Sequence, residues 1–254
     1  MSPDDRLVVG RANLEFRRWP GDAGRLPVLL LHEGLGSVSL WRDFPARLAE
    51  ETGREVIAWS RLGHGLSGPI PSARDPDYMH READGLPPLF DALGLQRAHL
   101  FGHSDGGSIA LIAAARFPAL AASLILEAPH VYVEQLTVES IAGMRDMFET
   151  TDLASKLSRH HADAEHIFRR WNDIWLDPRF REWTIEALLP AVTAPALLIQ
   201  GRDDEYGTMD QLERIEAVLL ESSRLELESC GHSPHRDQPQ AVLDRTVAFL
   251  EGRD

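Results

Sequence analysis

The chain has 254 residues, 43% of them hydrophobic, which is enough for one large core with a lid and barely enough for two independent domains. Its 40 acidic residues outnumber its 26 lysines and arginines, and the formal charge of −14 disfavours nucleic acid and anionic membranes as partners. The same charge weakly favours neutral or cationic small molecules, although it serves solubility equally well.

The cysteine count and the first residues bear on the compartment. A single cysteine, Cys230, excludes an intramolecular disulfide and gives no sign of an oxidising compartment. Residues 1–5 lack the basic start and apolar core of a signal peptide, and no apolar stretch approaches a membrane span in length. We therefore expect a soluble, cytoplasmic protein that is not bound to a membrane, and the sequence does not indicate its oligomeric state.

Short apolar runs recur along the chain and predict strands. The runs at 28–31, 56–59, 124–126 and 197–199 are apolar without interruption. A strand that is apolar on both faces must be covered on both faces, which indicates a parallel sheet between two layers of helices. Residues 14–17 alternate instead, as is typical of antiparallel pairing at a sheet edge. The predicted strands are residues 7–9, 14–19, 28–31, 56–59, 98–101, 123–126, 196–199 and 225–227.

Helical patterns lie between these strands. The predicted helices are residues 39–51, 78–93, 107–117, 209–220 and 240–251. Strands that alternate with helices in this way predict an α/β fold with right-handed crossovers.

One interval breaks the alternation. Residues 130–194 contain no convincing strand, only amphipathic helical sequence such as 141–148 and 164–176. We expect this interval to form a helical cap over the carboxyl ends of the strands, where α/β sheets bind ligands, and residues 1–129 and 195–254 to form the core. Trp171 and Trp175 lie four apart on one helix face, so they either pack the cap onto the core or contact substrate.

The most informative stretch is residues 100–107, where an apolar run enters the pattern Gly-x-Ser-x-Gly and a small-residue helix follows. A strand, a sharp turn and a helix in this order expose a serine hydroxyl above a sheet, so Ser104 is a candidate nucleophile. Gly102 and Gly106 suit this turn because neighbouring strands and helices pass too close for a Cβ.

A serine hydroxyl is inert near neutral pH unless a base takes its proton, and an acceptor must hold that base in one tautomer. Downstream, Asp203 and Asp204 lie at the tip of a tight turn after strand 196–199, and His232 follows strand 225–227. Because parallel strands end at one edge of the sheet, we expect Ser104, an acid of this turn and His232 to meet there.

With these motifs in place, the chain resembles the α/β-hydrolase superfamily over nearly its whole length. The resemblance is carried by Leu-Leu-His-Glu-Gly-Leu-Gly at 30–36, Arg-Leu-Gly-His-Gly-Leu-Ser at 61–67, the serine turn, the turn at 201–204 and Gly-His at 231–232. It implies the α/β-hydrolase fold, a mostly parallel eight-stranded sheet flanked by helices with a helical cap. It also implies a catalytic triad of Ser104, Asp204 and His232, since the family turn reads Gly-x-x-Asp.

The resemblance further implies an oxyanion hole made of two backbone N–H groups, those of Gly34 and Asp105. Family members usually carry glycine directly after the histidine at position 32, where this chain has Glu33. A carboxylate facing the developing oxyanion would oppose it, so we expect the Glu33 side chain to point away.

Asp105 itself is expected to lie in the pocket. A carboxylate beside a forming oxyanion is unfavourable, so a cation has to offset it, either from the protein (Arg61, Arg145, Arg169 or Arg170) or from the substrate. The Ser-Asp-Gly-Gly stretch and the Trp-x-x-x-Trp segment resemble the valacyclovir-hydrolase-like branch, which cleaves amino-acid esters. This resemblance implies that Asp105 binds the substrate amine, and the protein cation remains the alternative.

The other histidines and the cysteine are expected to be structural. His160, His161 and His166 in the cap have no Cys, Asp or Glu grouping with ligand spacing, so we predict no metal, and no motif calls for a cofactor. We expect His235 to flank the site and Cys230 to be buried at a strand end.

The predicted function is hydrolysis of small carboxylic esters through an acyl-enzyme on Ser104. Dehalogenases and epoxide hydrolases on this scaffold need a carboxylate at the serine position and are excluded. A carbon–carbon bond hydrolase of the meta-cleavage-product type uses the same three residues and stays open, with cap arginines binding its carboxylate. A non-catalytic small-molecule receptor, a lyase and a cofactor-free oxygenase are the further alternatives.

Overall fold

The computed structural model describes residues 6–70 and 75–254. Within these residues, eight strands form one sheet in the order β1-β2-β4-β3-β5-β6-β7-β8. The strands are β1 (Arg6–Val9), β2 (Ala12–Trp19), β3 (Val28–Leu31), β4 (Val56–Trp59), β5 (Ala98–His103), β6 (Ala121–Glu127), β7 (Ala196–Gly201) and β8 (Ser222–Leu227).

The pairing confirms the predicted α/β fold with a mostly parallel sheet. β2 pairs antiparallel with β1 and with β4, whereas every other described pair of neighbouring strands is parallel. Each predicted strand overlaps an observed one. The parts of the predicted core at residues 1–5 and 71–74, including the stretch examined for a signal peptide, lie outside the described residues.

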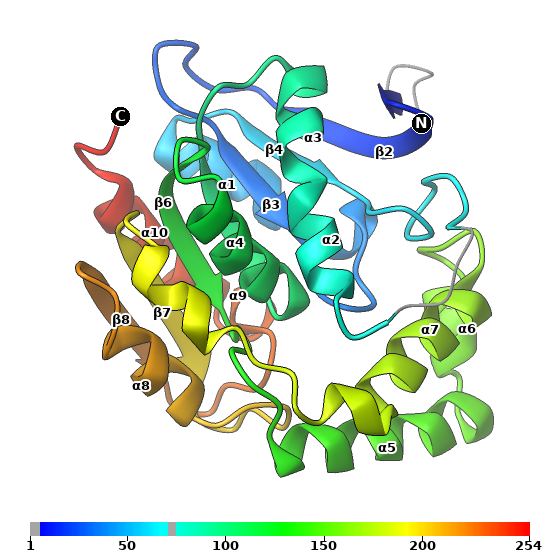
Figure 1. Cartoon of the computed structure of the whole chain (residues 1–254). Coiled ribbons are helices and arrows are strands. Elements are labelled where there is room, and N and C mark those ends of the chain that lie inside the picture. The colour runs from blue at the N-terminus through cyan, green and yellow to red at the C-terminus, as the bar shows by residue number, and fades with distance from the viewer. Residues whose placement is uncertain (1–5, 71–74) are drawn as a thin grey trace.

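Helices cover both faces of the sheet (Figure 1). One face carries α1 (Phe44–Thr52) and α10 (Pro239–Leu250); the other carries α2 (Tyr78–Asp84), α3 (Leu86–Leu93), α4 (Asp105–Arg116) and α8 (Asp210–Glu216). Successive residues of β3 therefore enter different cores: Leu29 and Leu31 pack with the second layer, Val28 and Leu30 with the first. This two-sided burial explains why the strand is apolar without interruption.

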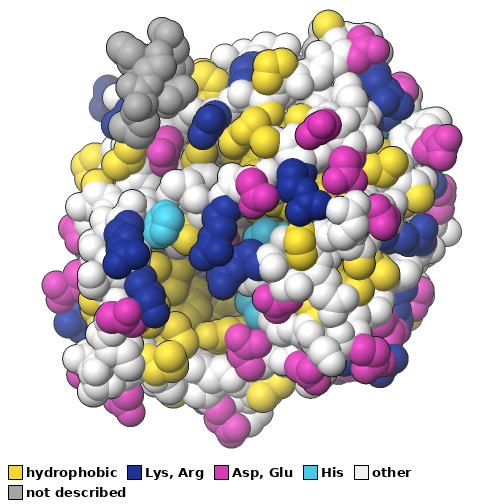
Figure 2. Space-filling model, turned by 180° about the vertical axis from the view of Figure 1, so that it is seen from behind, with side chains coloured by type: hydrophobic (Ala, Val, Ile, Leu, Met, Phe, Trp, Pro, Cys, Tyr) yellow, Lys and Arg dark blue, Asp and Glu magenta, His cyan; other side chains and the backbone are white. Residues whose placement is uncertain are grey.

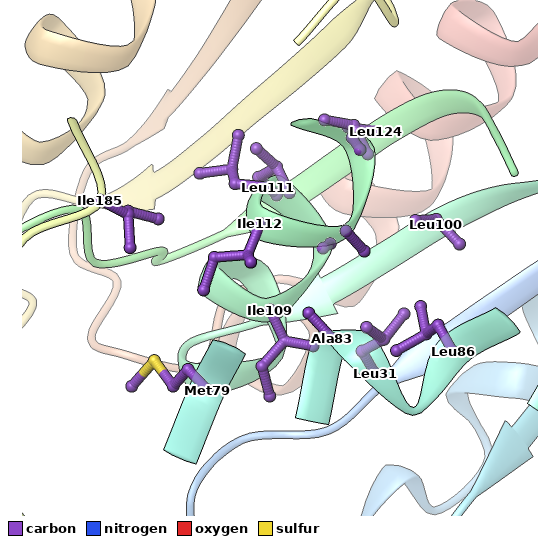
Figure 3. Close-up of a cluster of buried hydrophobic side chains, with 14 of the residues drawn as sticks. Leu31, Met79, Ala83, Leu86, Leu100, Ile109, Leu111, Ile112, Leu124 and Ile185 are labelled. Atoms are coloured by element: carbon purple, nitrogen blue, oxygen red, sulfur yellow. The ribbon is translucent and has the colours of Figure 1, made fainter. Parts of the chain in front are cut away.

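The core beneath α4 is built from short aliphatic side chains (Figure 3). Ile109 of α4 lies between Met79 of α2 and Leu31 of β3, and Ile112 and Leu100 belong to the same cluster. This packing fixes the first turn of α4 over the ends of β3 and β5, which is the region where the serine turn lies.

Two predicted helices are interrupted. Residues 39–51 form a 3₁₀ helix, η1 (Val38–Trp41), and then α1, because Arg42 between them has a positive φ of 54°. Residues 78–93 divide into α2 and α3 at Gly85, because prolines lack the backbone N–H that a continuing helix needs and are confined to the first turn of α3.

The segment between β6 and β7, all of it described, consists of helices and connecting loops and has one isolated bridge, between Tyr132 and Thr184. It contains α5 (Gln135–Thr150), α6 (Leu153–Leu157), α7 (Ala164–Leu176) and the 3₁₀ helices η2 (Pro178–Phe180) and η3 (Glu186–Ala191). Figure 1 shows α5, α6 and α7 beyond one end of the sheet rather than against its faces. None of the described helices is both long and apolar enough to cross a membrane.

Candidate active site

Ser104 lies at the junction of β5 and α4 and has φ 54° and ψ −120°, a strained conformation for a residue with a side chain. The turn is possible because Gly102 and Gly106 have no side chain: a Cβ at Gly102 would overlap the Gly106 carbonyl, and one at Gly106 would overlap the Leu31 carbonyl. The predicted reason for both glycines is therefore confirmed by the packing.

His232 connects Ser104 to Asp204. Its Nε2 atom lies 2.9 Å from Ser104 Oγ, and its Nδ1 atom lies 2.8 Å from Asp204 Oδ1. Asp204 follows β7, and His232 lies between β8 and the short helix α9 (Pro234–Asp237). The structure thus brings together the three predicted residues in one hydrogen-bonded line at the carboxyl ends of three parallel strands.

The surroundings of Asp204 favour its ionised form. The side chain is 1% exposed, and its carboxylate accepts hydrogen bonds from Gln200 Nε2 and from the backbone N–H of Tyr206, both at 2.8 Å. Burial alone would raise the pKa of Asp204, but the adjacent His232 and the hydrogen bond from the backbone N–H of Tyr206 lower it. An ionised Asp204 accepts the Nδ1–H of His232, which leaves Nε2 free to take a proton from Ser104.

Asp105, the first residue of α4, has its counter-charge within the protein. Its carboxylate is 1% exposed, accepts a hydrogen bond of 2.9 Å from the Tyr78 hydroxyl and lies 3.8 Å from Arg61 Nη2. Arg61, one of the four arginines considered from the sequence, therefore lies beside Asp105. Arg145 contacts Asp173, at 2.8 Å.

The other two arginines have different surroundings. Arg169 pairs with Glu165 at 3.0 Å, and Arg170 lines a separate cavity of about 320 Å³. Arg61 and Tyr78 also line that cavity, so they form the wall between it and the site of Ser104.

Ser104 opens into a pocket of about 250 Å³. The lining includes Gly34, Asp105, His232, Trp171 and Trp175, so every residue predicted for the site except the buried Asp204 borders this space. Figure 2 shows a hollow lined by hydrophobic side chains, with arginine or lysine and histidine side chains at its edge.

The two tryptophans of α7 differ in their surroundings. Trp171 packs directly on Gly34, and a Cβ at position 34 would overlap its ring. Trp175 is 1% exposed and packs against the rings of His130 and Phe180 at centroid distances of 5.2 and 5.0 Å. Trp171 thus packs the helical segment onto the loop after β3, as the packing alternative predicts, and both rings also border the pocket, so substrate contact stays a prediction.

The Glu33 side chain also borders the pocket, with 29% of it exposed. Its Oε2 atom lies 3.6 Å from Nδ1 of the buried His103, so the carboxylate has a defined basic neighbour. His103 in turn donates from Nε2 to the backbone carbonyl of His232, at 2.7 Å. Sequence reasoning missed this connection, because nothing in a strand-end histidine indicates which loops will lie beside it.

A second acid–histidine pair lies behind His103. Glu127, at the end of β6, accepts a hydrogen bond of 2.6 Å from His235 Nδ1, and both side chains are buried. His235 therefore flanks the site, as predicted. The charged Glu127, at the end of a buried strand with no other charged residue, is the signal in the sequence that could have identified this pair.

Ligand atoms of His103, Glu127 and His235 lie within 4.8 Å of one another, and this is the one such group among the described residues. The 2.6 Å separation of the Glu127 and His235 atoms is a hydrogen-bond length, shorter than the roughly 3.3 Å between ligands of a tetrahedral zinc ion. The present geometry therefore fits a hydrogen-bonded pair better than a metal centre.

The remaining predicted structural residues have local partners. His160 Nδ1 contacts Ser39 Oγ at 2.9 Å, and His161 Nδ1 accepts from the N–H of Gly65 at 2.9 Å. Burial raises the pKa of Cys230 to about 12, so its thiol stays protonated near neutral pH.

Comparison with known proteins agrees with this arrangement. A model of the alpha/beta hydrolase family matches residues 28–245. The human serine hydrolase BPHL is 30% identical over 207 residues, which cover 78% of this chain and 69% of that protein. A Pseudomonas putida protein, 2-hydroxy-6-oxononadienedioate/2-hydroxy-6-oxononatrienedioate hydrolase 2, is 25% identical over 275 residues, 97% of this chain and 95% of its own.

Among solved structures, a bacterial membrane phospholipase A superposes with a TM-score of 0.78 at 25% identity, covering 97% of this chain and 85% of that one. The family match spans most of the sheet and the segments that carry Ser104, Asp204 and His232. The chain therefore belongs to the alpha/beta hydrolase family.

Proposed function

We propose that this hydrolase cleaves small carboxylic esters through an acyl-enzyme on Ser104. The observation that carries the proposal is the unbroken line of hydrogen bonds from Asp204 through His232 to the Ser104 hydroxyl, which opens into a pocket. Each contact is between 2.8 and 2.9 Å, within the range in which a proton passes between heavy atoms.

In the first half of the reaction, Ser104 Oγ attacks the ester carbonyl while His232 Nε2 takes the hydroxyl proton. The carbonyl oxygen becomes an oxyanion, and the backbone N–H groups of Asp105 and Gly34 are the proposed donors to it. Each donor of this kind stabilises the transition state by about 2.7–4 kcal/mol. Collapse of the intermediate breaks the ester C–O bond, and the protonated His232 gives its proton to the departing alcohol.

In the second half, water enters the space that the alcohol has left. His232 removes a proton from this water as its oxygen attacks the acyl carbon, and the same two N–H groups bind the second oxyanion. The acid is released, and Ser104 regains its proton from His232. Asp204 keeps its charge throughout and stabilises the imidazolium form of His232.

We infer that residues 130–194 act as the cap of this site, with residues 1–129 and 195–254 as the core. The contacts of Trp171 with the Gly34 loop and the position of Trp175 in the pocket lining support this division. The pocket volume of about 250 Å³ supports a small substrate, and both tryptophan rings are proposed to contact it.

Binding of a substrate amine by Asp105, as in amino-acid ester hydrolases, is a second candidate. It is favoured by the place of Asp105 in the pocket lining and by the resemblance to that branch. The contacts with Arg61 and Tyr78 favour the other alternative, in which the protein itself offsets this carboxylate. We therefore place the amine role second.

Carbon–carbon bond hydrolysis has less support. The Pseudomonas putida relative, whose name gives a dienedioate substrate, is nevertheless similar over 97% of this chain. Two of the cap arginines expected to bind a carboxylate are paired with other side chains: Arg145 contacts Asp173, and Arg169 contacts Glu165. A direct comparison of aryl esters with dienoate ketones as substrates separates the two activities.

The proposed nucleophile is tested by labelling with a fluorophosphonate, which reacts with activated serines. We expect wild-type protein to be labelled at Ser104 and to hydrolyse short aryl esters, and Ser104→Ala to lose both. Asp203→Asn is a matched control, because Asp203 is exposed beside the site and lies outside the hydrogen-bonded line. Equal labelling of wild type and Ser104→Ala would refute the proposal.

A further inference from the structure

Glu33 poses an electrostatic problem for the proposed reaction. It directly precedes Gly34, whose N–H is a proposed oxyanion donor, and its partly exposed carboxylate borders the same pocket as Ser104. A negative charge in a partly desolvated pocket opposes the oxyanion that must form there. A compensating positive group is therefore needed close to Glu33.

His103 occupies the position that such a group requires. It is the residue immediately before Ser104, its side chain is buried, and its Nδ1 atom lies 3.6 Å from Glu33 Oε2. Its Nε2 atom donates to the backbone carbonyl of His232 at 2.7 Å. One imidazole ring therefore contacts the loop of the proposed oxyanion donor and the loop of the proposed base.

The groups around His103 favour a proton on both of its nitrogens. Glu33 faces it from the loop after β3, Glu127 from the end of β6, and the rings of His232 and His235 from the other side at 5.2 and 5.0 Å. Burial alone would lower the pKa of His103, but Glu33, Glu127 and the carbonyl of His232 raise it to about 9.

The pKa of Glu33 shifts in the opposite direction. Burial would raise the pKa of Glu33, but the adjacent His103 lowers it well below its usual range. Glu127 is already held by His235 at 2.6 Å, so Glu33 is the carboxylate on the pocket side of His103. The Glu33 Oε2 atom lies 3.6 Å from His103 Nδ1, which is ion-pair distance, so a positive charge on the ring stabilises this carboxylate while Nε2 donates to the carbonyl of His232.

We propose that His103 is a positioning residue which, as an imidazolium, holds the Glu33 carboxylate away from the oxyanion site and fixes the carbonyl of His232. This inference rests on the proposed function. It explains how the chain can have a carboxylate at position 33, where the resemblance predicts glycine. His103 touches no reacting atom, and it acts through Glu33 and His232.

The decisive experiment is a double-mutant cycle measured with an aryl acetate. We expect His103→Asn to lower kcat/KM by about 30–100-fold, because an uncompensated charge then faces the oxyanion. In a Glu33→Gly or Glu33→Gln background, the same His103→Asn change should cost less than about tenfold. Glu33→Gln keeps the size of the side chain and removes only its charge, so rescue by it assigns the effect to charge.

His99→Asn is the matched control. His99 is a buried histidine of the same strand, and it contacts Ser123 Oγ at 2.8 Å instead of the pocket. We expect this variant to leave kcat/KM within about twofold of wild type. An equal loss from His103→Asn with and without Glu33 would show a purely structural role for His103 and overturn the proposal.

Two further readouts keep the proposal falsifiable if His103→Asn does not fold. The rate of wild type should fall above about pH 9 as His103 loses its proton, and Glu33→Gln should lack this decline. A decline that persists in Glu33→Gln would overturn the proposal.

Nitrogen-15 NMR gives a readout that does not need turnover. We expect the His103 ring to be an imidazolium at pH 8 in wild type and to titrate at lower pH in Glu33→Gln. A neutral His103 at pH 8 in wild type would contradict the inference, whereas a charged His103 in a protein that no fluorophosphonate labels would contradict only the proposed function.

Discussion

The indole ring of Trp171 packs against the Cα of Gly34, so closely that a Cβ at position 34 would overlap the ring atoms Cδ1 and Nε1. Gly34 carries a proposed oxyanion donor, and Trp171 belongs to the helical segment between β6 and β7. The size of the side chain at position 34 therefore determines how closely this segment approaches the site.

Gly34→Ala should displace either Trp171 or the N–H at position 34. We expect kcat/KM for an aryl ester to fall by roughly tenfold or more, a fraction of the 2.7–4 kcal/mol that one donor contributes. Trp171→Phe has a smaller ring and should restore part of the loss when combined with Gly34→Ala. Steady-state kinetics of the four proteins test this, and a Gly34→Ala enzyme as active as wild type would contradict it.

Asp204→Asn should reduce kcat by about 10⁴-fold while leaving the fold intact, because an amide can hold His232 in the wrong tautomer. Asp203→Asn, one residue earlier on the same turn, should change kcat little. Kinetics and circular dichroism of both variants check this. If Asp203→Asn were the more damaging change, the acid of the triad would have been assigned to the wrong residue.

Asp105→Asn should reduce the hydrolysis of amino-acid esters and of matched esters without the amine by similar factors. The reason is that Asp105 is paired within the protein, so its loss disturbs Arg61 and Tyr78 whatever the substrate. Because both members of the ion pair are buried, we also expect the free energy of unfolding to fall by about 3 kcal/mol. A loss confined to amino-acid esters would instead assign the amine-binding role to Asp105.

The free energy of unfolding should fall as the pH drops from about 6.5 to about 4. Burial lowers the pKa of His99 and of His130 to about 4, so these side chains stay neutral in the folded protein over a range in which the unfolded chain binds protons. The unfolded state binds more protons throughout this window, so stability is lost toward acid. Urea unfolding at several pH values measures the slope.

His99→Asn removes one of these two groups and should make the decline with pH shallower. It keeps His130 as an internal reference, because that side chain packs against Trp175 in another part of the molecule. A steeper decline in His99→Asn than in wild type would show that other groups control the acid sensitivity.

The strands were predictable from the sequence because a strand buried on both faces is apolar at every position. A continuous apolar run such as Val28–Leu31 has no other common explanation in an α/β protein. Helix interruptions were harder, because Arg42 adopts a positive φ that no residue preference predicts, whereas the proline-rich stretch after Gly85 could have indicated a break.

At the site, the sequence identified residues that belong to recognisable motifs. It did not identify pairs of side chains that no motif connects. Ser104, the acids at 203–204 and His232 each follow a strand, so topology predicts that they lie at one edge of the sheet, and the resemblance selects Asp204. The pairing of Glu33 with His103 depends on how two side chains turn within a few ångströms, which sequence spacing does not encode. The sequence raised the question of where the Glu33 carboxylate points, but it did not identify His103 as the basic neighbour.

The helical segment is closed at its base. Ile185 donates its N–H to the Val131 carbonyl at 2.8 Å, the Thr184 hydroxyl donates to the same oxygen at 2.9 Å, and Thr184 also forms a bridge with Tyr132. Residues 131–132 and 184–185 thus meet beside the sheet, and η3, which follows them, packs against α4 and α8. Chimeras joined at residues 131 and 185 should therefore exchange the helical segment between relatives and leave Ser104, Asp204 and His232 in place.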